Sequence, residues 1–398
     1  MFSSLKVKEF RIYWVGMFIS LIGTWVQQVA QGWLVFELTN SAFLLGVVGF
    51  LGTIPIFLFS LLGGVFADRF SKRKILISTQ ISFMLLAFLL AILTQLKLIT
   101  PSQIIFIAVL NGLIMAFDAP SRQSVVAELV GREHLPNAIA LNSVAFNSSR
   151  IIGPALAGIL ASAIGLSGCF YLNGISFLAV IIALCLIRVK ERLGNHTSKA
   201  WGDLKEGIGF ALRHRTIFAL IIMVGAVSLF GTSYVILMPV FANEILGTGL
   251  KGLGLLMSAA GSGALIGALL LARLGDFQKK GQFLLVSSFV FSLSLIIFSL
   301  SKAYLLSFFA LVIVGGSAVA SIAVINTILQ TTVEDRFRGR LMSLFMLTFA
   351  GFTPFGNLAA GYLAQELGVS FAVAINGIAL TLFFVVINLG YPQIRKIK

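Results

Sequence analysis

Long apolar stretches dominate the chain and are separated by short polar segments. A helix needs about 20 apolar residues to cross the hydrocarbon core of a bilayer, at a rise of about 1.5 Å per residue. Two connections are very short, at Thr39–Ser41 and Gly165–Ser167, so the helices on either side of them are expected to be antiparallel neighbours. The stretches predict twelve transmembrane helices, near residues 12–36, 42–66, 74–95, 102–122, 138–163, 168–187, 216–241, 250–272, 282–300, 304–328, 341–364 and 370–390.

The basic residues give these helices an orientation. Of the 29 Lys and Arg residues, only Lys97, Lys251 and Lys302 fall on one predicted side of the membrane. Arg150 falls inside a span, and all the others lie on the opposite side, with both termini. Short cytoplasmic segments of membrane proteins carry an excess of Lys and Arg. Both termini and the central linker are therefore expected in the cytoplasm.

The composition excludes a water-soluble protein. Hydrophobic residues make up 58% of the 398 residues and charged residues only 11%, with a mean hydropathy of +1.02. A surface in contact with water needs more charge than this. The first eleven residues are polar and basic, so no cleavable signal peptide is expected. The net charge of +15 follows from the cytoplasmic loops and requires no nucleic acid. We expect a multi-pass protein of the inner (plasma) membrane, surrounded by lipid.

The two halves of the chain resemble each other. Identical residues recur at a constant separation of 203 positions over several spans. This recurrence predicts a tandem duplication into two parallel, pseudo-symmetric six-helix bundles. The bundles would span residues 1–188 and 216–398, joined by a cytoplasmic linker at 189–215. The linker contains an amphipathic stretch, Trp201 to Leu212, which we expect on the cytoplasmic surface. Residues that recur 203 positions later include Gly46, Gly49, Gly64, Gly112, Val130, Gly158, Asn173 and Gly174.

The loop between the second and third spans has a distinctive order of residues: Gly64, then Asp68-Arg69, then Lys72-Arg73. This order resembles motif A of the major facilitator superfamily, which occupies the same loop. From the charges alone, Asp68 can bond the start of the third span and pair with Lys72 or Arg73. The resemblance implies a latch that closes the two halves on the cytoplasmic side. The alternative is a plain basic loop that only sets orientation.

A second motif lies in the fifth span, where Gly153-Pro154 is followed by Ala157-Gly158. It resembles motif C of the antiporters in this superfamily, with Ala in place of one Gly. Pro154 removes a backbone donor and the small residues admit a close neighbour. The resemblance implies a span that seals the two halves against leakage, and a generic packing kink is the alternative. The segments 117–123 and 336–343 look like the branch that contains siderophore and macrolide exporters.

Ionisable groups inside a membrane are costly and are functional candidates. Arg150 lies near the middle of the fifth span and is a candidate for binding an anionic or polar substrate or for gating a proton, and a structural bond to helix carbonyls is the alternative. Asp118 lies in the cytoplasmic half of the fourth span and is a proton-coupling candidate. Asp118 could instead form a local pair with Arg122, four residues on, or join a relay with Lys72. Glu37, at the outer end of the first span, is the second coupling candidate.

Uncharged polar residues complete the candidate site. In the superfamily that the motifs resemble, spans 1, 4, 7 and 10 and parts of others line a central cavity. Hydrogen bonding between helices is the alternative role for each of these residues. A sparsely polar lining suits a bulky amphiphilic solute better than a sugar or a small ion. The candidate cavity residues, besides Arg150, are Gln27, Gln28, Gln31, Asn142, Asn147, Tyr234, Asn326 and Asn357.

These features favour a secondary transporter that acts as a monomer without a cofactor, on a small-molecule substrate. No nucleotide-binding loop, metal-ligand cluster or nucleophile with a base lies in the predicted spans, so an enzyme and an ATP-driven pump are not expected. A proton-coupled exporter of small amphiphilic compounds is favoured by the motif C resemblance. A facilitator, an importer or a lipid translocator without proton coupling is the alternative. It is favoured by the apolar residue at Ala108, where many related exporters carry Arg.

The predicted orientation can be tested by labelling. A tag at the C-terminus or within 193–200 should be reachable only from the cytoplasm, because the basic residues hold these segments there. Probes at Lys97, Lys251 and Lys302 should react with an impermeant reagent added outside intact cells. A reversed pattern at either set would contradict the twelve-span arrangement.

Overall fold

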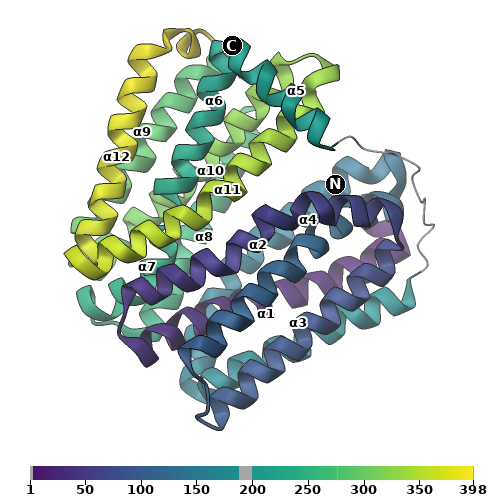
Figure 1. Cartoon of the computed structure of the whole chain (residues 1–398), viewed down its shortest axis with the longest axis vertical. Coiled ribbons are helices and arrows are strands. Elements are labelled where there is room, and N and C mark those ends of the chain that lie inside the picture. The colour runs from purple at the N-terminus through teal and green to yellow at the C-terminus, as the bar shows by residue number, and fades with distance from the viewer. Residues whose placement is uncertain (1–2, 188–199, 276, 398) are drawn as a thin grey trace. The chain divides into compact units, whose positions relative to one another are not determined.

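The structure, a computed structural model, describes residues 3–187, 200–275 and 277–397 (Figure 1). These residues form helices and short connections, with no strand among them. Short helical turns, η1 (Ser3–Lys6) and η4 (Pro392–Lys396), stand near the two ends. The α-helices are α1 (Lys8–Thr39), α2 (Ala42–Arg69), α3 (Lys72–Gln95), α4 (Pro101–Leu186), α5 (Ala200–Arg213), α6 (Arg215–Ala226), α7 (Tyr234–Val240), α8 (Gly249–Leu274), α9 (Lys280–Leu300), α10 (Tyr304–Thr332), α11 (Asp335–Leu367) and α12 (Val369–Gly390).

The predicted spans match these helices. Eleven described helical segments are long and apolar enough to cross a membrane. The longest of them, Glu133–Leu186, breaks at Gly165, where φ is +72°. Gly adopts this left-handed backbone without the steric cost that a Cβ would bring. The break divides the segment into the predicted fifth and sixth spans, so the prediction of twelve spans is confirmed.

The predicted seventh span is built from several pieces. The segment Arg215–Ile245 includes α6 and α7, separated by η2 (Val227–Gly231) and followed by η3 (Phe241–Ile245). Both η segments have the wider turn of a π-helix. Pro239 lies inside α7 and lacks the donor that a regular helix needs. Irregular turns of this kind are frequent near functional sites in helices.

The chain groups into two compact units. Unit 1 contains Met1–Asn40, Leu51–Ser198 and Leu250–Gly254, and unit 2 contains Ser41–Phe50, Lys199–Gly249 and Leu255–Lys398. The beginning of α2 therefore groups with unit 2, and the beginning of α8 with unit 1. Residues 189–199 of the predicted linker lie outside the described residues, and the bundle boundaries at 188 and 216 remain predictions.

In unit 1, α1 and α3 pack along α4, and glycines allow the closest approaches. A Cβ on Gly16 would lie 2.7 Å from the carbonyl oxygen of Ala179, and one on Gly153 would lie 2.4 Å from Cβ of Trp25. Without a strong hydrophobic force between helices in lipid, such close van der Waals packing stabilises the bundle. The parts of α4 that contain Gly153 and Ala179 are thereby packed against α1.

In unit 2, α9 packs between α10 and α12, as Figure 1 shows. The contact of α8 with α10 is closer still, because a Cβ on Gly315 would lie 1.9 Å from the carbonyl oxygen of Ala260. Gly112, the equivalent residue of the first half, meets the carbonyl oxygen of Gly52 in the same way, at 2.2 Å from an added Cβ. The predicted duplication is therefore visible in the packing.

A pair of buried asparagines gives a second sign of the duplication. Asn173 donates a hydrogen bond of 2.7 Å to Oε1 of Gln27, which joins the sixth span of the first half to its first span. Asn376, the residue 203 positions later, donates one of 3.0 Å to the hydroxyl of Ser233. The same side chain ties the equivalent helix in both halves.

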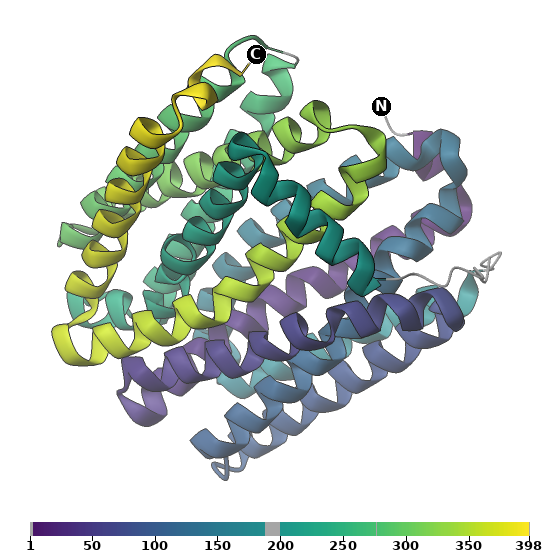
Figure 2. The same ribbon diagram turned by 45° about the horizontal axis from the view of Figure 1, so that its top comes forward.

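The amphipathic stretch of the linker forms the helix α5, which lies against the beginning of α11 (Figure 2), and its place on the cytoplasmic surface stays a prediction. The ring of Phe210 stacks on Phe337 with centroids 4.3 Å apart, and Glu206 pairs with Arg340 at 2.6 Å. A Cβ on Gly207 would approach the Arg340 carbonyl oxygen to 3.1 Å. Part of the apolar face of α5 is therefore covered by protein.

The close contact at Gly315 can be tested with Gly315→Ala. The added Cβ meets backbone rather than a flexible side chain, so the helices must separate, at a cost of about 1–3 kcal/mol. We expect a lower melting temperature in detergent. Gly209→Ala, at a position where a Cβ meets nothing within 4 Å, is the matched control and should not lower it. Equal melting temperatures for the two variants would contradict the packing.

Candidate transport site

Asp118 is the centre of a buried polar cluster in unit 1. Its side chain is fully buried. Oδ1 accepts hydrogen bonds from the Thr79 hydroxyl at 2.8 Å and from Nε2 of Gln80 at 2.7 Å. Oδ2 pairs with the guanidinium of Arg122, four residues further along the same helix. Three donors compensate the cost of burying this carboxylate.

The local pair of Asp118 with Arg122 forms as the i, i+4 spacing predicts. Lys72 is bonded to Glu128, and the functional roles considered for Asp118 stay predictions. Arg122 keeps 26% of its side chain exposed, although its Nε is buried without a described partner, whereas the Asp118 side chain is fully buried. Tyr13 of α1 lies within electrostatic reach of both residues, and its hydroxyl has no hydrogen-bond partner among the described residues.

Lys72 forms a different buried ion pair. Its ammonium lies 2.7 Å from Oε1 of Glu128 on α4, with 7% and 11% of the two side chains exposed. Arg73 donates to the carbonyl oxygens of Leu184 and Cys185, at 2.6 and 2.9 Å. These carbonyls end a helix and carry partial negative charge, which favours a cation there. The start of α3 is thus anchored to two parts of α4.

The expected pairing of Asp68 with Lys72 or Arg73 is not present. Within the described part of the chain, the half-buried Asp68 carboxylate makes no hydrogen bond or ion pair. Both bases lie at the start of α3, whose side chains meet α4 instead. Arg69 is exposed, and a Cβ on Gly64 would meet nothing within 4 Å. The close approach to α4 is made by Gly63, where an added Cβ would lie 2.0 Å from the Ala116 carbonyl oxygen.

The motif C residues all lie at close contacts within unit 1. Gly153 faces Trp25 of α1, as described above. The Pro154 carbonyl oxygen would lie 2.3 Å from a Cβ on Gly254, and a Cβ on Gly158 would lie 2.9 Å from Cα of Lys251. One face of this helix therefore packs on α1 and another on the first turns of α8, both through small residues.

Arg150 lies near the middle of the arm between Glu133 and Gly165, and its side chain is half-buried. It makes no hydrogen bond or ion pair with any residue that the structure describes. The Asp118 carboxylate pairs with Arg122 instead. Phe146 lies one turn before Arg150 and meets the ring of Trp25 edge-on, with centroids 5.9 Å apart. An unpaired cation and exposed aromatic surface are thus available on one stretch of α4.

The three glutamines of α1 differ from one another. Gln27 is buried and engaged by Asn173, so the alternative of hydrogen bonding between helices applies to it. Gln28 is exposed and Gln31 is half-buried, and neither has a partner among the described residues. Glu37 is exposed near the end of α1. Only Gln28 and Gln31 keep their amides available for a ligand.

The other polar candidates fall into the same two groups. Asn142 is half-buried and makes no described hydrogen bond, whereas Asn147 donates to the Ser143 carbonyl oxygen at 2.8 Å. In unit 2, Tyr234 is buried against Phe298. Asn326 accepts from Gln330 at 2.5 Å, and the buried Asn357 packs at Gly49 of α2. Helix contacts thus occupy most of these side chains.

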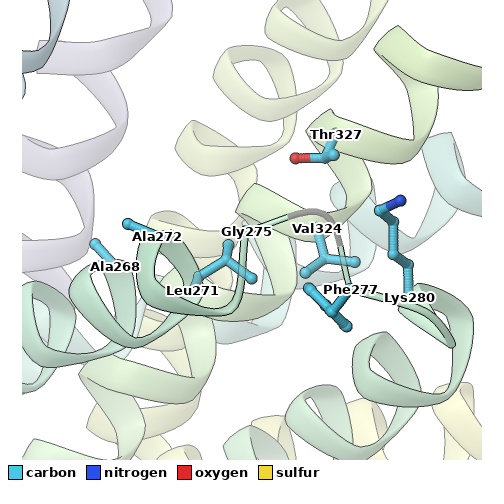
Figure 3. Close-up of a pocket in the computed structure, with 8 residues that line it drawn as sticks. All are labelled: Ala268, Leu271, Ala272, Gly275, Phe277, Lys280, Val324 and Thr327. Carbon is cyan, nitrogen blue, oxygen red and sulfur yellow. The ribbon is translucent and has the colours of Figure 1, made fainter.

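Unit 2 holds a separate pocket of about 320 Å³ near the end of α8 (Figure 3). Its walls are mostly apolar, with Lys280 and Thr327 as the polar members. None of the predicted cavity residues lines it. The lining comes from α8, α10 and the connection to α9: Ala268, Leu271, Ala272, Gly275, Phe277, Lys280, Val324 and Thr327.

Sequence reasoning missed several partners in these clusters. Thr79 and Gln80 lie on an apolar helix, and their contact with Asp118 depends on the packing of α3 against α4, which the sequence does not indicate. Glu128, the partner of Lys72, lies beyond the predicted fourth span. Its position 56 residues from Lys72 gave no local signal, whereas the four-residue spacing of Asp118 and Arg122 did.

The described residues form a polytopic helical protein with many apolar spans, a duplicated half and few embedded charges. Its fold is that of solved transporters. A bacterial homologue of the human lysosomal transporter Spinster aligns with a TM-score of 0.75 and 14% identity, over 97% of each chain. The nucleoside transporter NupG aligns with a TM-score of 0.72 and 13% identity, over 98% of this chain and all of NupG.

The chain belongs to the transmembrane secretion effector family of the major facilitator superfamily, whose model matches residues 1–397. The staphyloferrin A transporter of Staphylococcus aureus is 27% identical, over 98% of this chain and 97% of that protein. Macrolide efflux protein A of Streptococcus pyogenes is 23% identical, over 100% and 98%. The enterobactin exporter EntS of Shigella boydii is 22% identical, over 98% and 93%. The resemblance drawn from the motifs is confirmed, and with it the assignment to transporters rather than enzymes.

The buried pair of Lys72 and Glu128 can be tested with Glu128→Gln. The change removes the anion from a buried ion pair, which costs about 3–5 kcal/mol, so the melting temperature in detergent should fall clearly. Glu206→Gln is the matched control, because its pair with Arg340 is more exposed and contributes at most about 1 kcal/mol. A Glu128→Gln protein as stable as the Glu206→Gln protein would show that the pair contributes little.

Proposed function

We propose that this protein exports small amphiphilic compounds, drug-like or siderophore-like, across the inner (plasma) membrane by alternating access, in exchange for protons. The proposal is supported by membership of the secretion effector family and by relatives named for macrolide efflux, multidrug efflux and enterobactin export. The choice of small amphiphilic compounds as the substrate class is supported by Arg150 and its neighbours.

The observation that carries the proposal is Arg150. A charged side chain at the centre of a membrane helix costs about 2.5–3.5 kcal/mol on insertion, so it is retained where something compensates it. No described residue does so. An anionic or strongly polar group of the substrate would supply the missing partner, with a charge-assisted hydrogen bond that the guanidinium donates.

The surroundings of Arg150 suit an amphiphile. Phe146 leaves 48% of its surface exposed and, with Trp25, offers aromatic area for an apolar body. Gln28, Gln31 and Asn142 have amides without described partners, which can bind a few polar groups. Binding sites of this kind combine mostly apolar walls with a small number of placed polar groups.

Proton coupling is assigned to Asp118, with Glu37 as the second candidate. In the arrangement described here, Arg122 favours the ionised carboxylate. A conformational change that moves Arg122 away would leave the carboxylate buried and therefore favour its protonation. The return of Arg122 would release the proton. Alternating access would in this way load and unload one proton in each cycle.

The motif residues complete the proposal. Gly64, Asp68, Arg69, Lys72 and Arg73 would form the cytoplasmic latch, in which the bases hold α3 to α4 and the unengaged Asp68 remains available for a partner formed in the closed state. Gly153, Pro154 and Gly158 would seal the transport path through their close contacts. These roles match those that the motifs have in the superfamily.

A transporter without proton coupling is the second candidate, and one observation favours it. Asp118 has a donor for both carboxylate oxygens and a counter-ion four residues away, which is also the pattern of a purely structural ion pair. A facilitator, an importer or a lipid translocator would need no titrating group. A transport assay with and without a proton gradient distinguishes the proton-coupled exporter from the uncoupled transporter.

Transport should be measured in proteoliposomes, with and without an imposed proton gradient, on a panel of dyes, macrolides and siderophores. We expect accumulation against a substrate gradient only when protons are supplied. Arg150→Ala should lower substrate affinity about 10- to 100-fold, the effect of losing a hydrogen bond of about 1.5–3 kcal/mol to a charged group. Arg150→Lys should lower the affinity for anionic compounds less than Arg150→Ala does.

Arg11→Ala is the matched control, since Arg11 is an exposed Arg at the start of the same unit. Its transport should equal that of the unchanged protein. Equal affinity in Arg150→Ala for every compound would remove Arg150 from the substrate site. Equal uptake with and without the proton gradient would favour the uncoupled transporter instead.

A further inference from the structure

We propose that Thr79 is the positioning residue that allows Asp118 to exchange a proton without leaving the buried site unpaired. This inference rests on the proposed role of Asp118 in proton coupling. It assigns a function to a hydroxyl on α3 that belongs to none of the sequence motifs.

The Thr79 hydroxyl has one hydrogen to donate and two acceptors beside it. The Thr79 hydroxyl lies 2.8 Å from Oδ1 of Asp118 and 2.9 Å from the carbonyl oxygen of Leu76. A hydroxyl carries one hydrogen and can donate to only one acceptor at a time. Both acceptors stand within hydrogen-bond distance, so the hydroxyl can turn between them with little movement of heavy atoms.

Each orientation fits one protonation state. When Asp118 is ionised, Thr79 donates to Oδ1. When Oδ1 gains a proton, the new carboxylic O–H donates to the Thr79 oxygen, and the Thr79 hydrogen turns to the Leu76 carbonyl oxygen. No proton leaves Thr79 in this step, and the only proton gained is the one bound by Asp118. A hydroxyl that both donates and accepts is required, which a methyl group cannot replace.

The other neighbours of Asp118 tolerate the change. Gln80 donates from Nε2 to Oδ1, and a carboxylic oxygen retains a lone pair for that bond. Arg122 keeps its charge throughout, but 26% of its side chain is exposed, so it can be stabilised outside the site. Asp118 is fully buried and has no such outlet. A change of protonation in this pair would therefore fall on Asp118 rather than on Arg122.

The groups facing Asp118 come from three helices. Tyr13 approaches from α1, Thr79 and Gln80 from α3, and Arg122 from α4 itself. Lys72 and Glu128 pair with each other and do not bond the Asp118 carboxylate. Arg122 is thus the one cation bonded to Asp118 among the described residues, and its position decides which state of Asp118 is stable.

A bond from a hydroxyl to the carbonyl three or four residues earlier is common in membrane helices and by itself indicates nothing. Ser82, one turn further along α3, makes such a bond to the Ser78 carbonyl oxygen at 2.9 Å and has no hydrogen bond to an ionisable group among the described residues. Thr79 differs because its second acceptor is a fully buried carboxylate. Ser82 therefore provides the control for a change that removes only a backbone-bonded hydroxyl.

The test compares Thr79→Val, Thr79→Ser and Ser82→Ala in proteoliposomes. Two rates are measured for each: accumulation driven by a proton gradient, and substrate exchange without any gradient. Thr79→Val should lose gradient-driven accumulation at least tenfold and keep exchange within about twofold, because loading of a proton fails while the rest of the cycle remains. Thr79→Ser should restore accumulation, and Ser82→Ala should match the unchanged protein. Thr79→Ala replaces Thr79→Val if the latter is not recovered folded.

Asp118→Asn separates the two levels of the proposal. If Asp118→Asn still accumulates substrate with a proton gradient, the proposed role of Asp118 is wrong and the role of Thr79 falls with it. If Asp118→Asn fails and Thr79→Val accumulates substrate normally, only the inference about Thr79 is overturned. If Thr79→Val loses exchange as severely as accumulation, Thr79 is structural and the inference is likewise overturned.

Discussion

The cost of holding charge away from water is the constraint on which the rest of this structure depends. It explains why embedded ionisable groups are few and why Asp118, Lys72 and Glu128 each have a partner of opposite charge. It also makes Arg150 informative, because a cation without a described partner inside a span needs another source of compensation. In a transporter, that source can be the solute, whose binding then supplies the acceptor that Arg150 lacks among the described residues.

The same constraint links the packing of the helices to function. Lipid provides little force to drive helices together, so glycines and buried amides provide the contacts. Both halves use them alike, with Gly112 and Gly315 at the close crossings and Asn173 and Asn376 between the sixth span and the first. The halves differ in their charges, since the buried clusters around Asp118 and Glu128 belong to unit 1. A duplicated scaffold thus carries chemistry that one half has acquired or kept.

The scaffold could be predicted from the sequence because membrane spans depend on local composition. The number of spans and the pair of Asp118 with Arg122 follow from residues that are near in the chain. Contacts between distant residues could not be predicted in this way. The partner of Lys72 is Glu128 rather than Asp68, and Gly63 rather than Gly64 meets α4. These depend on how one helix rotates against another, and a rotation by one residue changes which side chain faces the neighbour.

The central claim is that Asp118 changes its protonation state during transport. Infrared difference spectroscopy of the reconstituted protein, recorded with and without bound substrate, measures this directly through the carboxylic-acid stretching band. The account predicts a band that changes on substrate binding, shifts in deuterium oxide and is absent from the Asp118→Asn protein. A protein that transports substrate in exchange for protons yet shows no such band from Asp118 would contradict the account.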